Sequence, residues 1–135
     1  MIRVGKLTVT KEVRTSDGRV MWRVDEPLEV SYDDGTAEVV AAGRLTDFAS
    51  VPRFLQPFLP AAAVHSAASV KHDWDYFNGR VTRFEADSRF YQTLRAERIP
   101  AWAALVMWGA VALFGGKAWK RHRKLGHPSR NAETF

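Results

Sequence analysis

Apolar and polar residues alternate along the first third of the chain, with the period of two that is typical of strands with one buried face. The alternation covers residues 7–10, 20–24, 28–32 and 37–40. An Asp-Gly pair at 17–18 separates the first two segments, and another at 34–35 separates the last two. Asp-Gly favours the backbone of hairpin turns. The pattern therefore predicts about four antiparallel strands in two β-hairpins.

The pattern then changes to one typical of helices. Residues 61–76 are rich in alanine and predict one helix that ends at residues 78–79. Thr82 and Glu85 have the spacing of a capping box and predict the start of a second helix, and Pro100 predicts the start of a third. Strands followed by helices indicate an α+β fold, with three helices packed on one side of the sheet.

The uncharged segment 99–116 reaches the length of a membrane span, and a basic run follows it. It is rich in alanine and contains three glycines, so its hydrophobicity per residue is low. A helix that is apolar on all sides is equally typical of the centre of a soluble core. We expect a buried helix rather than membrane contact by 99–116, and an interface with another subunit would bury it as well.

The chain of 135 residues has the size of one domain, to which we assign residues 1–119, with a basic C-terminal tail at 120–135. Most of the net charge of +5 comes from six basic residues near the end: Lys117, Lys120, Arg121, Arg123, Lys124 and Arg130. They either form a solvated tail or bind nucleic acid, anionic lipid or an acidic protein. No helix-turn-helix pattern precedes them, so we expect no nucleic-acid partner except through this tail.

Two features that the sequence lacks limit the kinds of chemistry and of export that we expect. The chain has no cysteine, which excludes disulfides, thiolate metal sites and cysteine nucleophiles. Residues 1–6 lack the apolar region of a secretory signal, so we expect another carrier if the protein leaves the cytoplasm.

Asp87 lies on the apolar face of the second predicted helix, four residues after Arg83 and three before Phe90. A carboxylate in such surroundings needs a cation or several hydrogen-bond donors. Two uses are open. Asp87 either forms a buried ion pair with Arg83 that locks two helices, or orients a histidine on the preceding helix, which a short loop would place antiparallel.

His72 lies on the first predicted helix, on the same face as Tyr76, while Asp73 points about 100° away around the helix. A histidine in a helix more often packs against its neighbours or lies at the surface than takes part in catalysis. With a partner such as Asp87, His72 can instead be a general base, or a metal ligand with a fixed tautomer.

Asp47 and Ser50 belong to the loop that leaves the predicted sheet. The ordinary use of both residues is a hydrogen bond to the backbone of a turn. No Gly-x-Ser-x-Gly motif surrounds Ser50, so we expect no serine nucleophile. Asp47, His72 and Asp73 together could bind a divalent metal, although the spacing of a zinc site is absent.

The order of these motifs resembles that of the DUF1353 family, small proteins of tailed bacteriophages and prophages. The resemblance covers about Trp22 to Trp119 and rests on four runs: Thr46-Asp47-Phe48-Ala49-Ser50-Val51-Pro52-Arg53; His72-Asp73-Trp74 with Tyr76; Arg83 with Ala86-Asp87 and Phe90; and Met107-Trp108-Gly109-Ala110-Val111 with Phe114-Gly115. It implies a phage context, an α+β domain and a site at these polar positions, but no reaction.

Three positions depart from the family's usual pattern. Lys71 and Asp75 stand where the family usually has apolar residues, and Ala112 stands at a position that is often basic. A looser similarity links the His72-Asp73 pair to the His-Asp pair of secreted phospholipases A2, in which the histidine is the base. The glycine-rich calcium loop and the cysteines of those enzymes are missing here.

We therefore expect a phage protein located in the virion, or otherwise in the host cytoplasm, with a hydrolase-like centre acting on the bacterial cell envelope. The expected catalytic residues are His72, Asp87, Asp73 and Asp47; the expected substrate-binding residues are Ser50, Arg83 and Tyr76; and the expected ligands of a divalent metal cofactor are Asp47, His72 and Asp73. The alternative is a non-catalytic tail or connector subunit that binds other phage structural proteins or its own copies, and whose polar cluster is a buried network.

Overall fold

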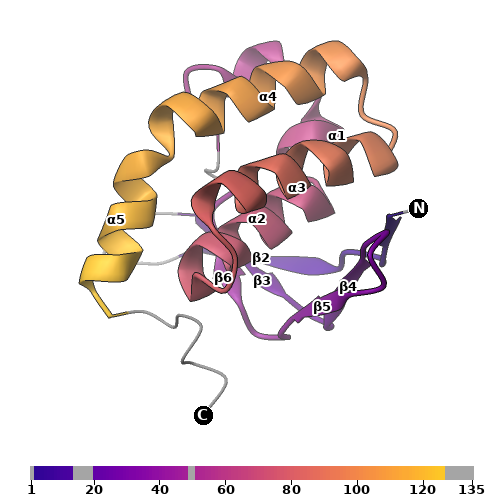
Figure 1. Ribbon diagram of the computed structural model, residues 1–135, viewed down its shortest axis with the longest axis vertical. Helices are drawn as coiled ribbons and strands as arrows, with labels where there is room; N and C mark the ends of the chain where they lie inside the picture. The colour runs from indigo at the N-terminus through magenta and orange to yellow at the C-terminus, as the bar shows by residue number, and fades with distance from the viewer. Residues whose placement is uncertain (1, 14–19, 49–50, 127–135) are drawn as a thin grey trace.

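The computed structural model describes residues 2–13, 20–48 and 51–126. Strands come first in this part of the chain and helices follow, which confirms the α+β class (Figure 1). The described strands form two antiparallel sheets, with orders β1-β4-β5 and β2-β3-β6. The strands are β1 (Arg3–Val4), β2 (Val9–Val13), β3 (Val20–Val24), β4 (Leu28–Ser31), β5 (Ala37–Val40) and β6 (Leu45–Thr46).

Both predicted hairpins are confirmed as strand pairs. In one, Val9 of β2 lies opposite Val24 of β3, and in the other Leu28 of β4 lies opposite Val40 of β5. The turn predicted at residues 16–18 lies outside the described residues. The two-residue strands β1 and β6 were not predicted, because two residues are too few to show a period.

The prediction of one helix over residues 61–76 is wrong. Ser66 interrupts it: its hydroxyl accepts a hydrogen bond from the backbone N–H of Ser69 and begins a new helix. The predicted boundary after Trp119 also lies inside a helix rather than at its end. The helical elements are η1 (Gln56–Phe58, a 3₁₀ turn), α1 (Ala61–Val64), α2 (Ala67–Asn78), α3 (Arg83–Ala96), α4 (Ala101–Phe114) and α5 (Gly116–Lys124).

The predicted signals at the ends of α2, α3 and α4 are confirmed. The Thr82 hydroxyl accepts the N–H of Glu85 at 3.1 Å and caps α3, and Pro100 caps α4. Gly79 ends α2 with a φ of 63°, and a Cβ there would lie 2.0 Å from the guanidinium of Arg123. Position 79 therefore requires glycine for two reasons: its backbone is left-handed, and α5 approaches it closely.

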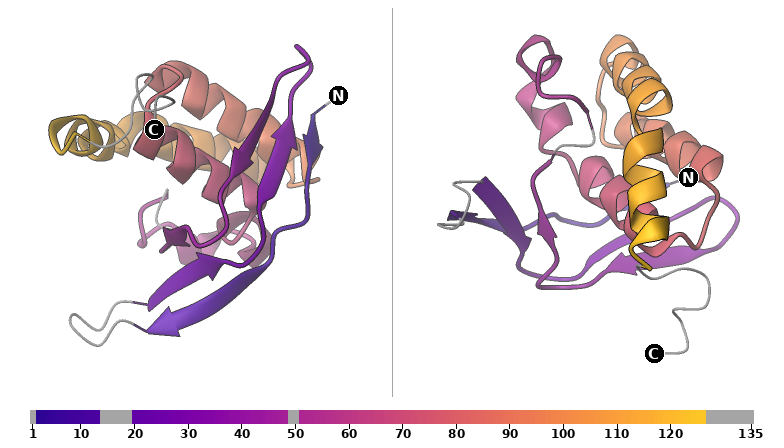
Figure 2. Two further views of the ribbon diagram at one scale, coloured as in Figure 1. Left: turned by 90° about the horizontal axis from the view of Figure 1, so that it is seen from below. Right: turned by 90° about the vertical axis from the view of Figure 1, so that its left-hand side faces the viewer.

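The helices lie on one side of the sheets, as predicted (Figure 2). Apolar side chains between the sheets and α2 form one core cluster, and those between the helices form a second. Arg123 of α5 donates to the carbonyls of Tyr76 and Phe77 at 2.9 and 2.6 Å, which binds α5 to the C-terminal end of α2. The two clusters hold α2 at the centre of the molecule.

The uncharged helix α4, expected to be a buried helix, is buried on one face only in this structure. Met107 and Val111 are completely buried, whereas Trp102 and Leu113 are 56% and 79% exposed. No single helix in the described part of the chain has the length and apolarity of a membrane span. Within these described residues, α4 and α5 taken together pass that test by length and composition, and a bend of 51° separates them.

Candidate functional site

The structure brings His72 of α2 and Asp87 of α3 together across the interface of the two helices. Nε2 of His72 lies 2.7 Å from Oδ1 of Asp87, which is hydrogen-bond distance. The turn between Gly79 and Thr82 is short, so α3 returns beside α2 and the two side chains face each other. Because a carboxylate oxygen only accepts, this bond assigns the imidazole proton to Nε2.

Two further side chains complete the network around Asp87. The Tyr76 hydroxyl donates to the same Oδ1 at 2.7 Å, and Arg83 Nε donates to the Tyr76 oxygen at 3.2 Å. Burial and the bond to Asp87 raise the pKa of Tyr76, so this hydroxyl remains a donor. Arg83 Nη2 also donates to the carbonyls of Val111 and Ala112. The network thus connects α2, α3 and the end of α4.

Aromatic rings hold the imidazole in place. His72 is 3% exposed, and its ring centre lies 4.3 Å from that of Tyr76 and 4.6 Å from that of Phe90. Packing against both rings and the hydrogen bond to Asp87 together fix the orientation of the imidazole. A histidine that acts as a general base is held in the same way.

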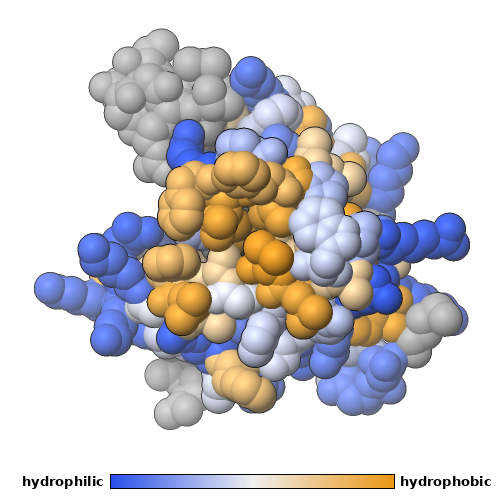
Figure 3. Space-filling view, turned by 90° about the horizontal axis from the view of Figure 1, so that it is seen from above, coloured by the Kyte–Doolittle hydropathy of each residue, from blue (hydrophilic) through white to orange (hydrophobic). Residues whose placement is uncertain are grey.

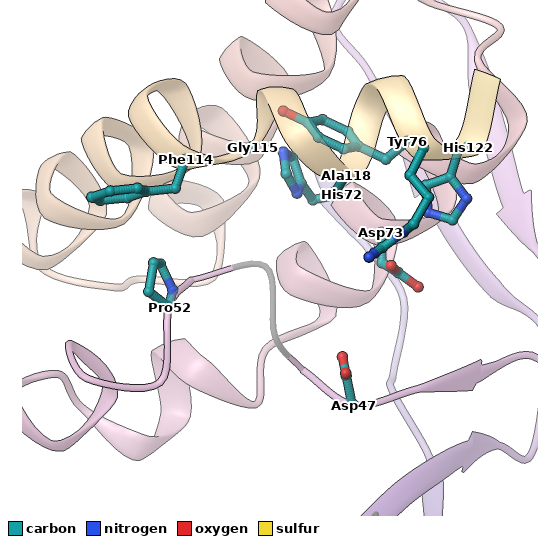
Figure 4. A pocket seen from close by; sticks show the side chains of 10 residues that line it. Asp47, Pro52, His72, Asp73, Tyr76, Phe114, Gly115, Ala118 and His122 are labelled. Atoms are coloured by element: carbon teal, nitrogen blue, oxygen red, sulfur yellow. The ribbon is translucent and has the colours of Figure 1, made fainter. Parts of the chain in front are cut away.

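The remaining edge of the imidazole borders a pocket of about 190 Å³ (Figure 4). Asp87 is bound to Nε2, so Nδ1 is the ring nitrogen left for a molecule in this pocket. Asp87 and Arg83 are not among the lining residues. The lining consists of Asp47, Pro52, His72, Asp73, Tyr76, Phe114, Gly115, Ala118, Arg121 and His122.

Two carboxylates face the same pocket from different elements. Asp73 follows His72 on α2 and pairs with Arg44 at 3.3 Å, and Asp47 follows directly on β6. Burial raises the pKa of Asp73, Arg44 opposes this change, and nearby Asp47 adds to it. The pocket therefore has one acidic side, which contains Asp47 and Asp73.

The loop that presents Asp47 is fixed by its neighbours. Phe48 is buried with a φ of 55°, which is uncommon for a residue with a large side chain, and it packs against Trp22 and His65. Gln56 of η1 donates to the carbonyls of Phe48 and Val51 at 3.3 and 3.0 Å. Ser50, predicted to bind substrate, lies outside the described residues.

The predicted metal ligands are not assembled. Within residues 2–13, 20–48 and 51–126, no three histidine or acidic side chains converge to a metal-binding distance. Asp47, His72 and Asp73 share the pocket, but they do not form a ligand set in this structure. Arg83, predicted to bind substrate, donates to Tyr76 and to the end of α4 and is not among the residues that line the pocket.

The sequence interpretation missed the wall of the pocket that α5 provides. Ala118, Arg121 and His122 line it, whereas residues from 120 onward were assigned to a tail. Their spacing of three and four residues is that of one helical face and was the available signal. The close contact between Gly115 and Tyr76 was not predicted either. A Cβ atom at position 115 would lie 2.6 Å from the Tyr76 hydroxyl.

A second polar cluster lies between β5, α2 and α3. The side chain of Lys71 is 2% exposed and forms ion pairs with Asp75, one turn further along α2, and with Glu38 Oε2 at 2.5 Å. Arg89 binds the other oxygen of Glu38 at 2.9 Å. Lys71 and Asp75, which the sequence analysis singled out together with Ala112, are therefore partners of each other.

Asp75 gives this cluster a pH dependence. Burial raises its pKa to about 7, although Lys71 opposes the shift, and its Oδ2 is buried without a hydrogen-bond partner. The ordinary value is 3.8, so between about pH 4 and pH 7 the folded state keeps a proton that the unfolded state has lost. The free energy of unfolding therefore falls as pH rises through this interval.

We expect wild-type protein to lose stability relative to Asp75→Asn between about pH 4 and pH 7, because only the wild type ionises a buried group there. Above pH 7 the difference should stay constant. Urea denaturation of both proteins across this range measures the effect. A stability difference that is the same at both ends of the interval would show that Asp75 has an ordinary pKa.

The chain belongs to a family of proteins of unknown function, DUF1353, whose model matches residues 22–111. It is also 32% identical over 102 residues to the uncharacterized protein y4jT of Sinorhizobium fredii (strain NBRC 101917 / NGR234). This match covers 74% of the chain and 30% of the relative, so the chain spans less than a third of that protein's length. No solved structure matches the chain.

Proposed function

We propose that this protein is a hydrolase of a tailed phage or prophage that acts on the bacterial cell envelope, with His72 as its general base. The observation that carries the proposal is the 2.7 Å bond from His72 Nε2 to Asp87 at the wall of a pocket. An imidazole held by a buried carboxylate on one nitrogen, with the other left for a ligand, is the arrangement used in acid–base catalysis. The phage setting rests on the family resemblance.

The proposed reaction needs one proton to move twice. Nδ1 of His72 takes a proton from a water molecule while the water oxygen attacks the carbonyl or phosphoryl group of the substrate. Asp87 stabilises the imidazolium through Nε2–H, and Nδ1 then returns the proton to the leaving group. Tyr76 and Arg83 hold Asp87 in position and take no part in the transfer.

The pocket limits what can enter. A volume of about 190 Å³ is smaller than a typical drug-sized site, so it admits the group that reacts and not a whole polymer unit. Arg121 lines the wall and supplies positive charge for an oxyanion that forms during attack. The ester or phosphodiester group of a lipid, or the group around one bond of the peptidoglycan polymer, is small enough to enter this pocket.

A specific observation favours a second candidate, a non-catalytic tail or connector subunit. His72 is almost fully buried, and the network of His72, Asp87, Tyr76 and Arg83 connects three helices. In that case the cluster stabilises the fold, and its contribution would appear in the stability of the protein rather than in any rate.

The test is a peptidoglycan zymogram and a phospholipid-hydrolysis assay of the full chain beside His72→Gln and His72→Ala. We expect both variants to lose at least about 100-fold in rate, because general-base catalysis contributes that much. His65→Gln is the matched control: His65 is exposed and does not line the pocket, and glutamine keeps a planar side chain beside Phe48, so its rate should equal that of wild type.

Thermal unfolding of the same four proteins separates the two candidates. The hydrolase proposal expects His72→Gln to remain folded with its rate lost. Wild-type protein without activity in either assay, combined with His72 variants that only unfold at lower temperature, would leave the structural subunit as the function.

A further inference from the structure

The exposed face of α4 and the exposed cations of α5 form one continuous surface, here called the α4–α5 surface. Its apolar part consists of Trp102, Leu105, Val106, Trp108, Leu113 and Phe114, which are between 37% and 79% exposed. Its basic part consists of Lys117, Lys120, Arg121 and Lys124. Figure 3 shows this apolar patch at the centre of one face, with hydrophilic side chains at its border.

A neighbouring segment enlarges the apolar part. Phe54 is 64% exposed, and its ring lies edge-on to that of Phe114 with a centre distance of 6.1 Å. Exposed apolar side chains are normally scattered singly, and a contiguous group marks a surface that binds something. α4 has no charged residue that would interrupt the group.

The charges decide which partner fits. No acidic residue occurs between Arg98 and Gly126, so every charge on the α4–α5 surface is positive. A second copy of the chain docked through the same face would add a second set of cations and no acidic residue to pair with them, because a two-fold interface uses one patch on both subunits. An anionic lipid surface offers negative headgroups to the basic part and acyl chains to the apolar part.

We infer that the α4–α5 surface binds the protein to a lipid bilayer that contains anionic lipids, with α4 lying in the plane of the interface. The two tryptophans suit this depth, since indole rings prefer the region of the headgroups. Phe114 and Arg121 belong to this surface and also line the His72 pocket, so binding would bring the pocket to the headgroups. The inference does not depend on hydrolysis.

The test is co-sedimentation of the full chain with vesicles of phosphatidylglycerol and phosphatidylcholine in equal parts, and with phosphatidylcholine alone. We expect binding to the anionic vesicles that weakens as salt is raised, and much weaker binding to the neutral vesicles. Lys117→Gln/Lys120→Gln should bind anionic vesicles about 30-fold more weakly, at about 1 kcal/mol for each lysine.

Two matched controls keep the test specific. Arg3→Gln/Lys6→Gln removes the same charge from the sheet side and should bind as wild type does. Leu113→Ser should weaken binding about tenfold through lost apolar contact, whereas Val39→Ser on β5 should not change it. His72→Gln should bind normally, which separates this inference from the proposed activity.

Several results would overturn the inference. The first is a wild-type protein that binds neither kind of vesicle. The second is equal loss of binding in the lysine variant and in its sheet-side control. The third is a dimer in solution that Leu113→Ser dissociates, without any vesicle binding, which would identify a second copy as the partner.

Discussion

Replacing Asp87 with asparagine is expected to lower the rate of the proposed hydrolysis by about 10⁴-fold, the size of effect known for an orienting aspartate behind a histidine. The carboxylate fixes the proton on Nε2 and stabilises the imidazolium, and an amide does neither. An amide can also turn its N–H₂ toward the ring and favour the proton on Nδ1, which would then no longer be a base.

The measurement is kcat/KM for Asp87→Asn beside wild type, with thermal unfolding as the control for the fold. Asp34→Asn, in the exposed turn between β4 and β5, is the matched change of a carboxylate to an amide and should keep the full rate. An Asp87→Asn protein that is folded and retains the wild-type rate would show that Asp87 has no part in the reaction.

At about pH 8, above the pKa of Asp75, Lys71→Met is expected to lower the free energy of unfolding by about 3–5 kcal/mol, the usual cost of removing one partner of a buried ion pair. Lys71 is 2% exposed and provides the positive charge between Asp75 and Glu38. Glu38 retains Arg89, but among the described residues Asp75 keeps no cation within contact distance, and its second oxygen has no hydrogen-bond partner there.

The double variant Lys71→Met/Asp75→Leu should recover most of that loss, because a buried ion pair can be replaced by apolar side chains of similar volume at little cost. Urea denaturation of the wild type, the two single variants and the double variant forms a complete cycle. A double variant whose loss equals the sum of the two single losses would mean that the two side chains are not energetically coupled.

The sequence was informative wherever the signal was local. Alternation and Asp-Gly turns predicted both hairpins, and Thr82 with Glu85 predicted the start of α3. The meeting of His72 and Asp87 was also predictable, because a short turn between two helices leaves few ways to arrange two polar residues on apolar faces.

Contacts that depend on distant segments were not predictable. Nothing near Lys71 in the chain indicates that Glu38 of β5 completes its pairing, since 33 positions separate them. Good helix formers flank Ser66 on both sides, so helix propensity alone favours one continuous helix. The hydrogen bond that the Ser66 hydroxyl accepts in the structure shows that the helix is interrupted there. The pocket wall formed by α5 depends on the bend after α4, which periodicity does not reveal.

The central claim is that His72 carries its proton on Nε2, toward Asp87, and leaves Nδ1 as a base for the pocket. Long-range proton–nitrogen NMR of protein labelled at histidine tests it directly, with His72→Gln used to assign the signals. We predict a protonated Nε2 and an unprotonated Nδ1 in the neutral ring, and a change of this pattern in Asp87→Asn. A proton on Nδ1 in the wild type, or a pattern that Asp87→Asn leaves unchanged, would contradict the account.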